Sequence, residues 1–481
     1  MSNNEIRGLK PKALWNNFAN LNAVPRASKK EERVIDFMVQ FGKKLNLPTT
    51  VDKTGNVIIK KSATAGMENR KTVILQAHLD MVHQKNNDTD FDFNSQGIQM
   101  YVDGDWVKAK GTTLGADNGL GVSAIMAILE SNDMAHPTIE ALFTIDEETG
   151  MTGAMGLEGK NLSGEILLNL DTEEDDEIDI GCAGGIDITA TKSYRPIALT
   201  DNAIAYKISV KGLQGGHSGM DIHLGLGNAN KLMNRILYAV KDLIEIASID
   251  GGGLRNAIPR ESNAIIITKD KTAFQKNFKE TADAIKTEYK TIEKSLQIIA
   301  KPADQPKNLL SKEDKNNLIK TLYGVHNGVF RMSPDIENLV ETSNNLARVE
   351  VNNGSINVFC LTRSSIETGK QDLVNAISSV FELGGFTVKA SGSYPGWKPN
   401  PDSPILEVLS KTYKKLFKES PNVLACHAGL ECGIIGKHKP EMDMISFGPT
   451  IKGAHSPDER ASISSTQKFW KFTKEVLKNI P

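Results

Sequence analysis

Three consecutive acids, Asp146, Glu147 and Glu148, follow an apolar run with β character in the segment ALFTIDEETGMTGA, and a glycine turn comes after them. Neighbouring carboxylates repel one another, and this repulsion costs free energy unless a positive charge lies among them. An isolated acidic triplet is often only a solvated strand end. The segment therefore has two interpretations, a solvated surface turn or part of a site that binds metal ions.

Other residues that could bind metal also follow apolar runs. His78 ends VILQAHLD, Asp171 ends ILLNLD, Asp117 lies in the glycine loop GTTLGADNG, and His455 lies in SFGPTIKGAHSPDE after the last apolar strand. Each of these residues alone is more often structural or solvated, because loops carry many polar side chains. Their repeated position at strand ends favours a shared site over separate surface positions.

Histidine and carboxylate ligands without cysteine suit zinc, manganese or cobalt in a catalytic site better than a closed structural zinc site. The number of acids favours two ions over one. Three carboxylates and a bridging hydroxide would balance two divalent cations, whereas a single zinc ion could not balance so many acids. The pattern therefore predicts a centre of two divalent metal ions, with Zn2+ favoured and Co2+ or Mn2+ as alternatives.

The adjacent positions of Glu147 and Glu148 suggest that the two acids have different roles. Successive side chains of a strand point to opposite faces, so the adjacent residues Glu147 and Glu148 are not expected to bind the same ion in the same way. One acid can be a ligand while the other accepts a proton from a metal-bound water. Asp80 lies two residues after His78, on the same side, and could orient that imidazole through a hydrogen bond.

The elements that must position these residues follow an α/β pattern. Residues 10–47 predict two helices, and short apolar strands then alternate with helical segments as far as ILLNLD. Buried strands alternating with helices indicate a mostly parallel sheet flanked by helices. Functional side chains of such sheets gather at the carboxyl ends of the strands, where these candidates lie.

The middle of the chain has a different character, with alternating strands and long charged helices that indicate an α+β insertion. The segment TVKASGSYPGWKPNPDSP, rich in Pro, Gly and Ser, is interpreted as a boundary, after which the helix and strand alternation resumes. The predicted organisation is a catalytic domain in two parts, residues 1–185 and 396–481, with a lid domain inserted at 186–395.

Composition narrows the class of protein. The 481 residues include 57 basic and 59 acidic side chains, interspersed along the chain, so nucleic acid is a poor candidate for the partner. The beginning of the chain lacks an apolar run of signal-peptide length, and no apolar run is long enough to span a bilayer, so we expect a cytoplasmic protein that does not bind membranes. The four cysteines lack CxxC spacing and are expected to be reduced.

Six segments, in this order and spacing, resemble the di-metal metallopeptidases of family M20: AHLDMV, GADNGLG, TIDEETGMTGA, NLDTEE, GGHSG and GAHSPDE. Within that family, they are most similar to the branch of cytosolic Xaa-His or non-specific dipeptidases. The resemblance extends from the N-terminal helices to the last helix. It implies the fold of the di-zinc exopeptidases, with a catalytic domain and an inserted lid.

The resemblance also implies a role for each candidate in the metal centre. Asp117 would bridge the two ions, with His78 and Asp171 on one ion and Glu148 and His455 on the other. Glu147 would be the general base and Asp80 the partner of His78. Structures of the family further imply a cis peptide bond after Asp117.

Residues outside the metal centre are implied to bind the substrate. His217 in GLQGGHSGMDI matches the position that steadies the carbonyl oxygen as it becomes an oxyanion, and a loop histidine is its alternative. Asn256 and Arg363 resemble lid residues that contact the oxyanion and the free α-carboxylate, although a surface Arg is equally ordinary. Glu431 in CHAGLECG would receive the α-ammonium group, and His427 is either a pocket wall or a packed core residue.

The expected function is metal-dependent hydrolysis of dipeptides, of broad specificity or of the Xaa-His type, by a hydroxide bound to the two metal ions with Glu147 as general base. A homodimer is compatible with the family. Another M20-like amide hydrolase, such as an N-acyl amino acid deacylase, is the alternative enzyme. A non-catalytic binding protein on a relict peptidase fold is the alternative from a different class.

Overall fold

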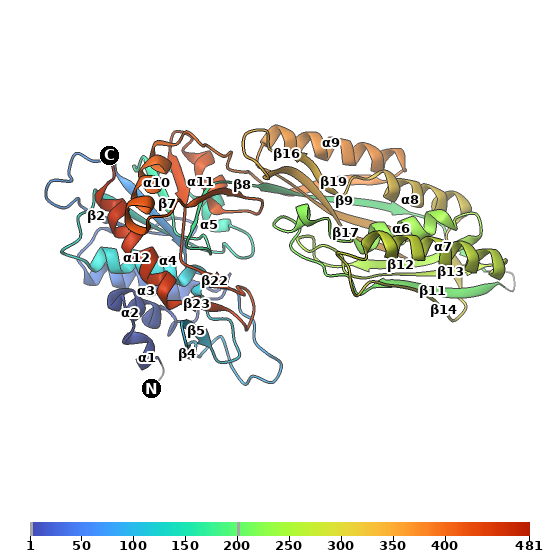
Figure 1. Ribbon diagram of the computed structural model, residues 1–481, viewed down its shortest axis with the longest axis horizontal. Helices are drawn as coiled ribbons and strands as arrows, with labels where there is room; N and C mark the ends of the chain where they lie inside the picture. The colour runs from blue at the N-terminus through green and yellow to red at the C-terminus, as the bar shows by residue number, and fades with distance from the viewer. Residues whose placement is uncertain (1–2, 200–202) are drawn as a thin grey trace. The chain divides into compact units, whose positions relative to one another are not determined.

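A computed structural model describes residues 3–199 and 203–481, and this part of the chain forms two compact units (Figure 1). The first unit comprises Met1–Gly181, Trp397–Ala425 and Leu430–Pro481, and the second comprises Cys182–Gly396 and Cys426–Gly429. Each unit is therefore built from segments that are distant in the sequence. None of the helices in residues 3–199 and 203–481 combines the length and the apolar character needed to span a bilayer.

An eight-stranded sheet forms the centre of the first unit. Its strands are, in spatial order, β1 (Thr49–Val51), β2 (Val57–Lys61), β6 (Ile139–Thr144), β3 (Val73–His78), β7 (Ile166–Asn169), β21 (Asp443–Ser446), β8 (Glu177–Cys182) and β20 (Asn422–Cys426). The four central strands, from β6 to β21, run parallel, whereas the pairs β1–β2, β2–β6 and β21–β8 are antiparallel. The predicted α/β fold is confirmed, with a parallel centre and antiparallel flanks.

Helices and a small sheet complete the first unit. The helices are α1 (Asn4–Arg7), α2 (Lys12–Leu21), α3 (Glu32–Lys44), α4 (Ala116–Glu130), α5 (Thr152–Gly156), α10 (Pro404–Phe417), α11 (Glu431–His438) and α12 (Ile463–Lys478), with a 3-10 turn at Gly159–Asn161. Helix α4 packs against β3 and α2, and α10 packs against β21 and α12. The small antiparallel sheet has the order β22 (Ile451–Lys452), β23 (Arg460–Ser462), β5 (Trp106–Ala109) and β4 (Met100–Asp103).

The burial of each element in the first unit explains its residue types. Strands β3, β6 and β7 are buried along their whole length, as expected of central parallel strands with both faces covered. Helix α4 is apolar nearly all round and is buried from Asn118 to Leu129, which is typical of a helix in the interior of a domain. The candidate residues His78, Glu148 and Asp171 lie at the carboxyl ends of these buried strands or shortly after them.

The second unit is built on a nine-stranded antiparallel sheet. Its main path is β14 (Gln297–Pro302), β11 (Ile204–Lys211), β13 (Ser262–Thr268), β12 (Ile244–Gly252), β17 (Val340–Asn352), β18 (Ser355–Ser364), β9 (Gly184–Ser193) and β19 (Thr387–Tyr394), and β16 (Gly328–Met332) pairs with β17. A two-stranded sheet joins β10 (Ile197–Ala198) to β15 (Asn308–Leu309), and Ile222–Leu224 form a 3-10 turn. The segment interpreted as a boundary begins with β19, so irregular structure starts only after Tyr394.

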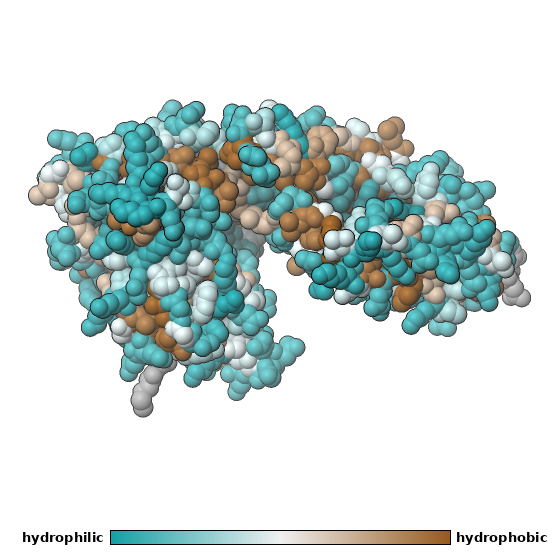
Figure 2. Space-filling model, viewed as in Figure 1, coloured by the Kyte–Doolittle hydropathy of each residue, from teal (hydrophilic) through white to brown (hydrophobic). Residues whose placement is uncertain are grey.

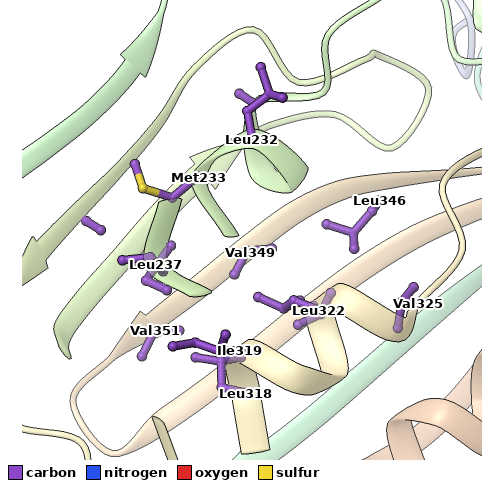
Figure 3. Close-up of a cluster of buried hydrophobic side chains, with 14 of the residues drawn as sticks. Leu232, Met233, Leu237, Leu318, Ile319, Leu322, Val325, Leu346, Val349 and Val351 are labelled. Carbon is purple, nitrogen blue, oxygen red and sulfur yellow. The ribbon is translucent and has the colours of Figure 1, made fainter. Parts of the chain in front are cut away.

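Four helices pack against the sheet of the second unit, namely α6 (Ala229–Ala239), α7 (Lys271–Tyr289), α8 (Lys312–Gly324) and α9 (Glu367–Leu383) (Figure 1). Alternate residues of the strands and the apolar sides of these helices form one buried cluster. Figure 3 shows its centre, where Leu237 of α6 and Leu322 of α8 lie over Val349 of β17. Figure 2 shows mainly hydrophilic residues on the visible face of each unit, with smaller hydrophobic areas among them.

Candidate dinuclear metal centre

The loop before α4 presents Asp117. Gly115 has a φ of 71°, which glycine adopts without steric cost, and the Asp117–Asn118 peptide bond is cis, as the family resemblance implied. The carboxylate of Glu459 accepts hydrogen bonds from the N–H groups of Leu114, Gly115 and Ala116 at 2.7 to 2.9 Å, and from that of Asp117 at 3.3 Å. One buried carboxylate therefore satisfies four successive backbone donors and fixes the loop that carries Asp117.

His78 and Asp171 follow from the centre of the sheet. His78 is the last residue of β3, and Asp171 comes two residues after the end of β7, which pairs with β3 in parallel. The side-chain amide of Asn118 donates to the carboxylate of Asp171 and, at 2.9 Å, to the backbone oxygen of Leu170. These neighbouring strand ends place the two side chains close together, with 3.5 Å between His78 Nε2 and Asp171 Oδ1.

The acidic triplet lies in a turn and not in a strand. Strand β6 ends at Thr144, so the expectation that strand alternation separates Glu147 from Glu148 is wrong. Asp146 is buried with a φ of 54°, a conformation that Asp tolerates better than most residues, and its carboxylate accepts hydrogen bonds from Thr149 and Thr152. This left-handed residue turns the chain immediately before the two glutamates.

Asp80 holds the same turn from the neighbouring strand. Its carboxylate accepts hydrogen bonds from the N–H groups of Glu147 at 3.1 Å and Glu148 at 3.2 Å, and from Ser28 Oγ at 2.8 Å. His78 Nδ1 lies 3.1 Å from the backbone oxygen of Asp80 and 3.5 Å from Asp80 Oδ1. Asp80 therefore orients the imidazole mainly through its carbonyl oxygen, while its carboxylate positions both glutamates.

The side chains converge around the two oxygens of Asp117. Oδ1 lies 3.1 Å from His78 Nε2, whereas Oδ2 lies 3.1 Å from His455 Nε2. His455 Nε2 is also 2.9 Å from Glu148 Oε2. Asp117 therefore lies between two groups of potential metal ligands, His78 and Asp171 on one side and His455 and Glu148 on the other. This is the arrangement expected of a carboxylate that bridges two ions.

The charges at this centre shift several pKa values. Burial opposes the charged form of His78, but Asp171 and Asp117 raise its pKa well above the usual value. Hydrogen bonds to Asp117 and Glu148 raise the pKa of His455 to about 11. Burial, together with the nearby charges of Asp171 and Glu148, raises the pKa of Glu147. The carboxylates and imidazoles thus form one strongly coupled group of charges.

The donor set fits divalent cations. Glu148 Oε1 is buried and has no hydrogen-bond partner, although buried polar atoms are nearly always satisfied. With Nδ1 donating to the Asp80 carbonyl, neutral His78 keeps a lone pair on Nε2 that points toward Asp117. Imidazole nitrogen and carboxylate oxygen suit zinc, manganese and cobalt, and ligand atoms of His78, Asp117 and Glu148 all lie within 4.8 Å of one another.

Glu431 begins α11 in the same unit and is fully buried. Its Oε2 accepts hydrogen bonds from Gln76 Nε2 at 2.7 Å and Thr144 Oγ1 at 2.5 Å, whereas its Oε1 has no partner. Burial raises its pKa to about 8, despite the hydrogen bond from Thr144. An unpaired carboxylate oxygen in a buried position suits a cationic ligand group.

The other three candidates gather within the second unit. Arg363 Nη2 lies 3.4 Å from His217 Nε2, and the backbone oxygen of exposed Asn256 accepts a hydrogen bond from Ser218 next to His217. His217 Nδ1 accepts from the N–H groups of Gly219 and Met220, so Nε2 carries the proton in the neutral ring. Two hydrogen-bond donors therefore face each other, an arrangement that an anion between them would satisfy.

His427 lies in the same cluster and is buried. Ser343 Oγ is 2.8 Å from its Nε2, and Tyr394 Oη accepts from Arg363 Nη1 at 3.0 Å. Burial and the charge of Arg363 lower the pKa of His427 to about 3, so the ring is neutral. Of the two alternatives for this histidine, the structure places it among packed polar residues beside Arg363.

Three residues position the site although the sequence motifs did not predict a role for them. Glu459, Asp146 and Arg26 were assigned no role, yet Arg26 is fully buried and donates to the backbone oxygens of Leu79, Asp80 and Gly115. Two of them could have been suspected, because Asp146 lies in the acidic triplet and Glu459 ends the GAHSPDE motif. Arg26 lies in the otherwise unremarked segment between two helices and gave no signal.

Known proteins resemble this chain over most of its length. The sequence model described as Peptidase family M20/M25/M40 matches residues 74–479. A protein of Escherichia coli strain K12 named cytosol non-specific dipeptidase is 44% identical over 481 residues, which cover 99% of each chain. The crystal structure of aminoacylhistidine dipeptidase from Vibrio alginolyticus is 44% identical, covers 99% of this chain and 98% of its own, and has a TM-score of 0.90.

A more distant structure shares the fold alone. It is a tripeptidase from Staphylococcus aureus that is 15% identical, with 98% of this chain and 99% of the other covered and a TM-score of 0.58. The similarity therefore extends across both units of the chain.

Proposed function

This chain belongs to peptidase family M20/M25/M40, and on that basis we propose that it is a metal-dependent dipeptidase that hydrolyses short, unblocked peptides. Its relatives at 44% identity are named for cytosol non-specific dipeptidase and aminoacylhistidine dipeptidase activities. The substrate class is therefore dipeptides, of broad specificity or of the Xaa-His type. The name of the relative cytosol non-specific dipeptidase supports the further proposal that this chain acts in the cytosol.

The main support for this proposal is the arrangement of the candidate metal ligands in two groups, one on each side of Asp117. One carboxylate oxygen faces His78 and the other faces His455, and each histidine has its own second acid. We assign His78 and Asp171 to one ion, Glu148 and His455 to the other, and Asp117 to both. When bound, the two cations would lower the pKa of water and polarise the scissile carbonyl group.

Glu147 is assigned the role of general base. Asp80 holds its backbone beside that of Glu148, whereas the two histidines lie against the carboxylates of Asp117, Asp171 and Glu148. A carboxylate that is not used as a ligand can accept the proton of the attacking water and return it to the leaving amine nitrogen. Burial raises the pKa of Glu147, which makes its carboxylate a stronger base.

The protein has side chains of opposite charge for the α-ammonium and α-carboxylate groups of a dipeptide. Buried Glu431, with Oε1 unpaired, is assigned to the α-ammonium group. Arg363 is assigned to the α-carboxylate, for which a guanidinium fork is well suited. His217 and Asn256, which lie side by side in the second unit, are assigned to the carbonyl oxygen as it becomes negative. These groups together predict that both termini of the substrate must be free.

A substrate panel tests the proposal. Purified full-length protein is assayed with dipeptides, including β-alanyl-histidine, and with N-acetylated amino acids, in the presence of zinc, cobalt or manganese and after chelation. We expect turnover of free dipeptides that chelation abolishes and metal restores. Turnover of the acylated amino acids alone would instead identify an N-acyl amino acid deacylase, and activity that survives complete removal of metal would contradict the assigned centre.

A further inference from the structure

A chain of buried polar side chains crosses the central sheet of the first unit and begins at Glu431. Gln76 of β3 donates from Nε2 to Glu431 Oε2 at 2.7 Å and to Thr144 Oγ1 at 3.1 Å. Asn169 of β7 donates from Nδ2 to Gln76 Oε1 at 2.5 Å. Three neighbouring strands of the central sheet, β6, β3 and β7, thus contribute polar residues to one continuous path.

The path continues to a second buried carboxyl group. Ser446 Oγ of β21 lies 2.5 Å from Asn169 Oδ1, Thr172 Oγ1 lies 2.8 Å from Ser446 Oγ, and Asp179 Oδ2 of β8 lies 2.8 Å from Thr172 Oγ1. Gln76, Asn169 and Ser446 are fully buried, and Asp179 is 7% exposed. Glu431 and Asp179 are therefore the two ends of one hydrogen-bond chain that is fully buried at Glu431 and slightly exposed at Asp179.

The number of hydrogen atoms in this chain constrains its charge. Three contacts connect Asn169 Oδ1 to Asp179 Oδ2, but the hydroxyl groups of Ser446 and Thr172 supply only two hydrogens. The third hydrogen atom must come from the carboxyl group of Asp179, which is then protonated and donates to Thr172. Thr172 in turn donates to Ser446, and Ser446 donates to Asn169. If the side-chain amides of Gln76 and Asn169 are both rotated by 180°, each hydrogen bond of the chain runs in the opposite direction, and Glu431 instead of Asp179 must be protonated. In either direction of the hydrogen bonds, one of the two carboxyl groups, Glu431 or Asp179, is protonated and the other is ionised.

We propose that Asp179 is a positioning residue of the active site: it holds the single proton shared along this chain and thereby keeps Glu431 ionised for the substrate ammonium group. The orientation of the amides supports this direction, since Gln76 and Thr144 both donate to Glu431 Oε2. The role of Glu431 rests on the proposed function, whereas the shared proton follows from the hydrogen-bond chain itself.

The electrostatic surroundings agree with one retained proton. Burial raises the pKa of Asp179 to about 6, although Thr172 is a hydrogen-bond partner and Glu177 is the acid that faces it. Burial also raises the pKa of Glu431 to about 8, so without metal the proton would favour the Glu431 end of the chain. Glu431 faces His78, which lowers its pKa, and Asp171 and Asp80, which raise it. The two divalent cations, one of them assigned to His78 and Asp171, would add positive charge near Glu431 and lower its pKa, so the proton is held at the end of the chain away from them.

Infrared spectroscopy of the full-length, zinc-saturated protein tests this assignment without substrate. A protonated carboxyl group has a C=O stretching band that an ionised one lacks. We expect such a band near pH 7 that disappears in Asp179→Asn and persists in Thr172→Val. A band that instead persists in Asp179→Asn and disappears in Glu431→Gln would overturn the proposal, as would the absence of any band lost in Asp179→Asn.

A second measurement tests the connection between the two ends. In Glu431→Gln, the new amide can donate to Gln76, so the chain can reverse and Thr172 can donate to ionised Asp179. We expect the midpoint of the Asp179 band to fall by at least one pH unit, and to fall by much less when Thr172→Val interrupts the chain. An equal fall in both backgrounds would show coupling through space only and would contradict the shared proton. Failure of the dipeptide assay would leave these midpoints unchanged and would remove only the role of Glu431 in binding ammonium.

Discussion

At the scale of single residues, adjacent acids have different surroundings. Glu148 is close to His455 and has one unpaired oxygen, whereas Glu147 has a pKa raised by burial and by neighbouring charges. The separation does not arise from strand alternation, because β6 has already ended at Thr144. It arises from a turn in which Asp80 holds both backbone N–H groups.

Substituting each glutamate separately should therefore have different effects. Glu147→Gln is expected to keep two bound metal ions and to lower kcat by about 10²- to 10⁴-fold, because only the proton acceptor is lost. Glu148→Gln is expected to lose metal, because it removes a ligand charge. Metal analysis and steady-state kinetics measure both. Equal metal contents and equal kcat values in the two variants would show that the roles are not divided in this way.

His427 should make the second unit sensitive to acid. Its pKa of about 3 lies below the unfolded value of 6.5, so between these values the unfolded chain binds a proton that the folded chain does not. The stability contributed by the neutral ring is complete above pH 6.5 and declines as the pH falls, by about 2 kcal/mol at pH 5.

Urea unfolding at pH 7.5 and pH 5 measures this decline. His427→Gln should lose less stability between the two pH values than the native protein, because glutamine does not titrate. His438→Gln, at an exposed position, should behave like the native protein. An unchanged pH dependence in His427→Gln would mean that the buried ring does not resist protonation.

At the scale of elements, His78, Glu148 and Asp171 lie at or after the ends of parallel strands, Asp117 lies at the start of α4 and His455 lies between β22 and β23, and other side chains hold these segments. The positions after strands could be predicted, because His78 and Asp171 directly follow apolar runs that the sequence displays. The supports could not, since Glu459 and Arg26 act through backbone groups that are distant in the sequence. The polar residues inside β3 and β7 were equally hidden, because a single Gln or Asn in an apolar strand does not reveal its partner.

Glu459 should affect metal affinity without touching metal. Glu459→Gln replaces one acceptor oxygen by an amide donor that faces backbone N–H groups, so the loop carrying Asp117 is expected to lose its fixed position. Residues that orient metal ligands typically contribute 10- to 100-fold to affinity, and we expect a loss of about this size. Competition with a chelator measures it. Exposed Glu407→Gln serves as control, and an equal affinity in both variants would contradict the role of Glu459.

Helix α9 provides a matched pair for the core of the second unit. Leu373 is fully buried in the apolar cluster, whereas Leu383 at the end of the same helix is 90% exposed. Leu373→Ala should lower the free energy of unfolding by about 2 to 5 kcal/mol, because it removes buried methyl groups and leaves a cavity. Leu383→Ala should change it by less than about 0.5 kcal/mol. Chemical denaturation compares the two, and similar values would mean that α9 does not pack as described.

At the scale of the whole molecule, the five proposed ligands all come from the first unit, and the cluster of His217, Asn256 and Arg363 comes from the second. The alternation of strands and helices was sufficient to predict an α/β fold with an insertion. The small four-stranded sheet was not predicted, because strands of two to four residues carry little periodic signal. The antiparallel flanks of the central sheet were not predicted either, because the periodicity of a strand does not show the direction of its neighbour.

Metal binding should therefore protect one unit selectively. Addition of zinc to metal-free protein is expected to slow hydrogen exchange of the backbone amides at Leu114–Asp117, because these groups hold a ligand loop in place. Amides of α6, in the core of the second unit, should exchange at the same rate with and without zinc. Mass spectrometry of proteolytic fragments measures both, and equal protection in the two units would contradict a metal centre confined to the first.

The order in which the chain leaves the ribosome gives the divided first unit a further consequence. Four proposed ligands are synthesised before the second unit begins, but His455 and the supporting Glu459 are synthesised only after it. The nascent first segment therefore exposes a carboxylate-rich, half-formed cation site while the inserted unit is still being translated. Domains generally fold as units during synthesis, so the second unit can reach its native state first. Completion of the metal centre then follows folding of the second unit, and a chain cut between the second unit and His455 is expected to contain a folded second unit and an incomplete metal site.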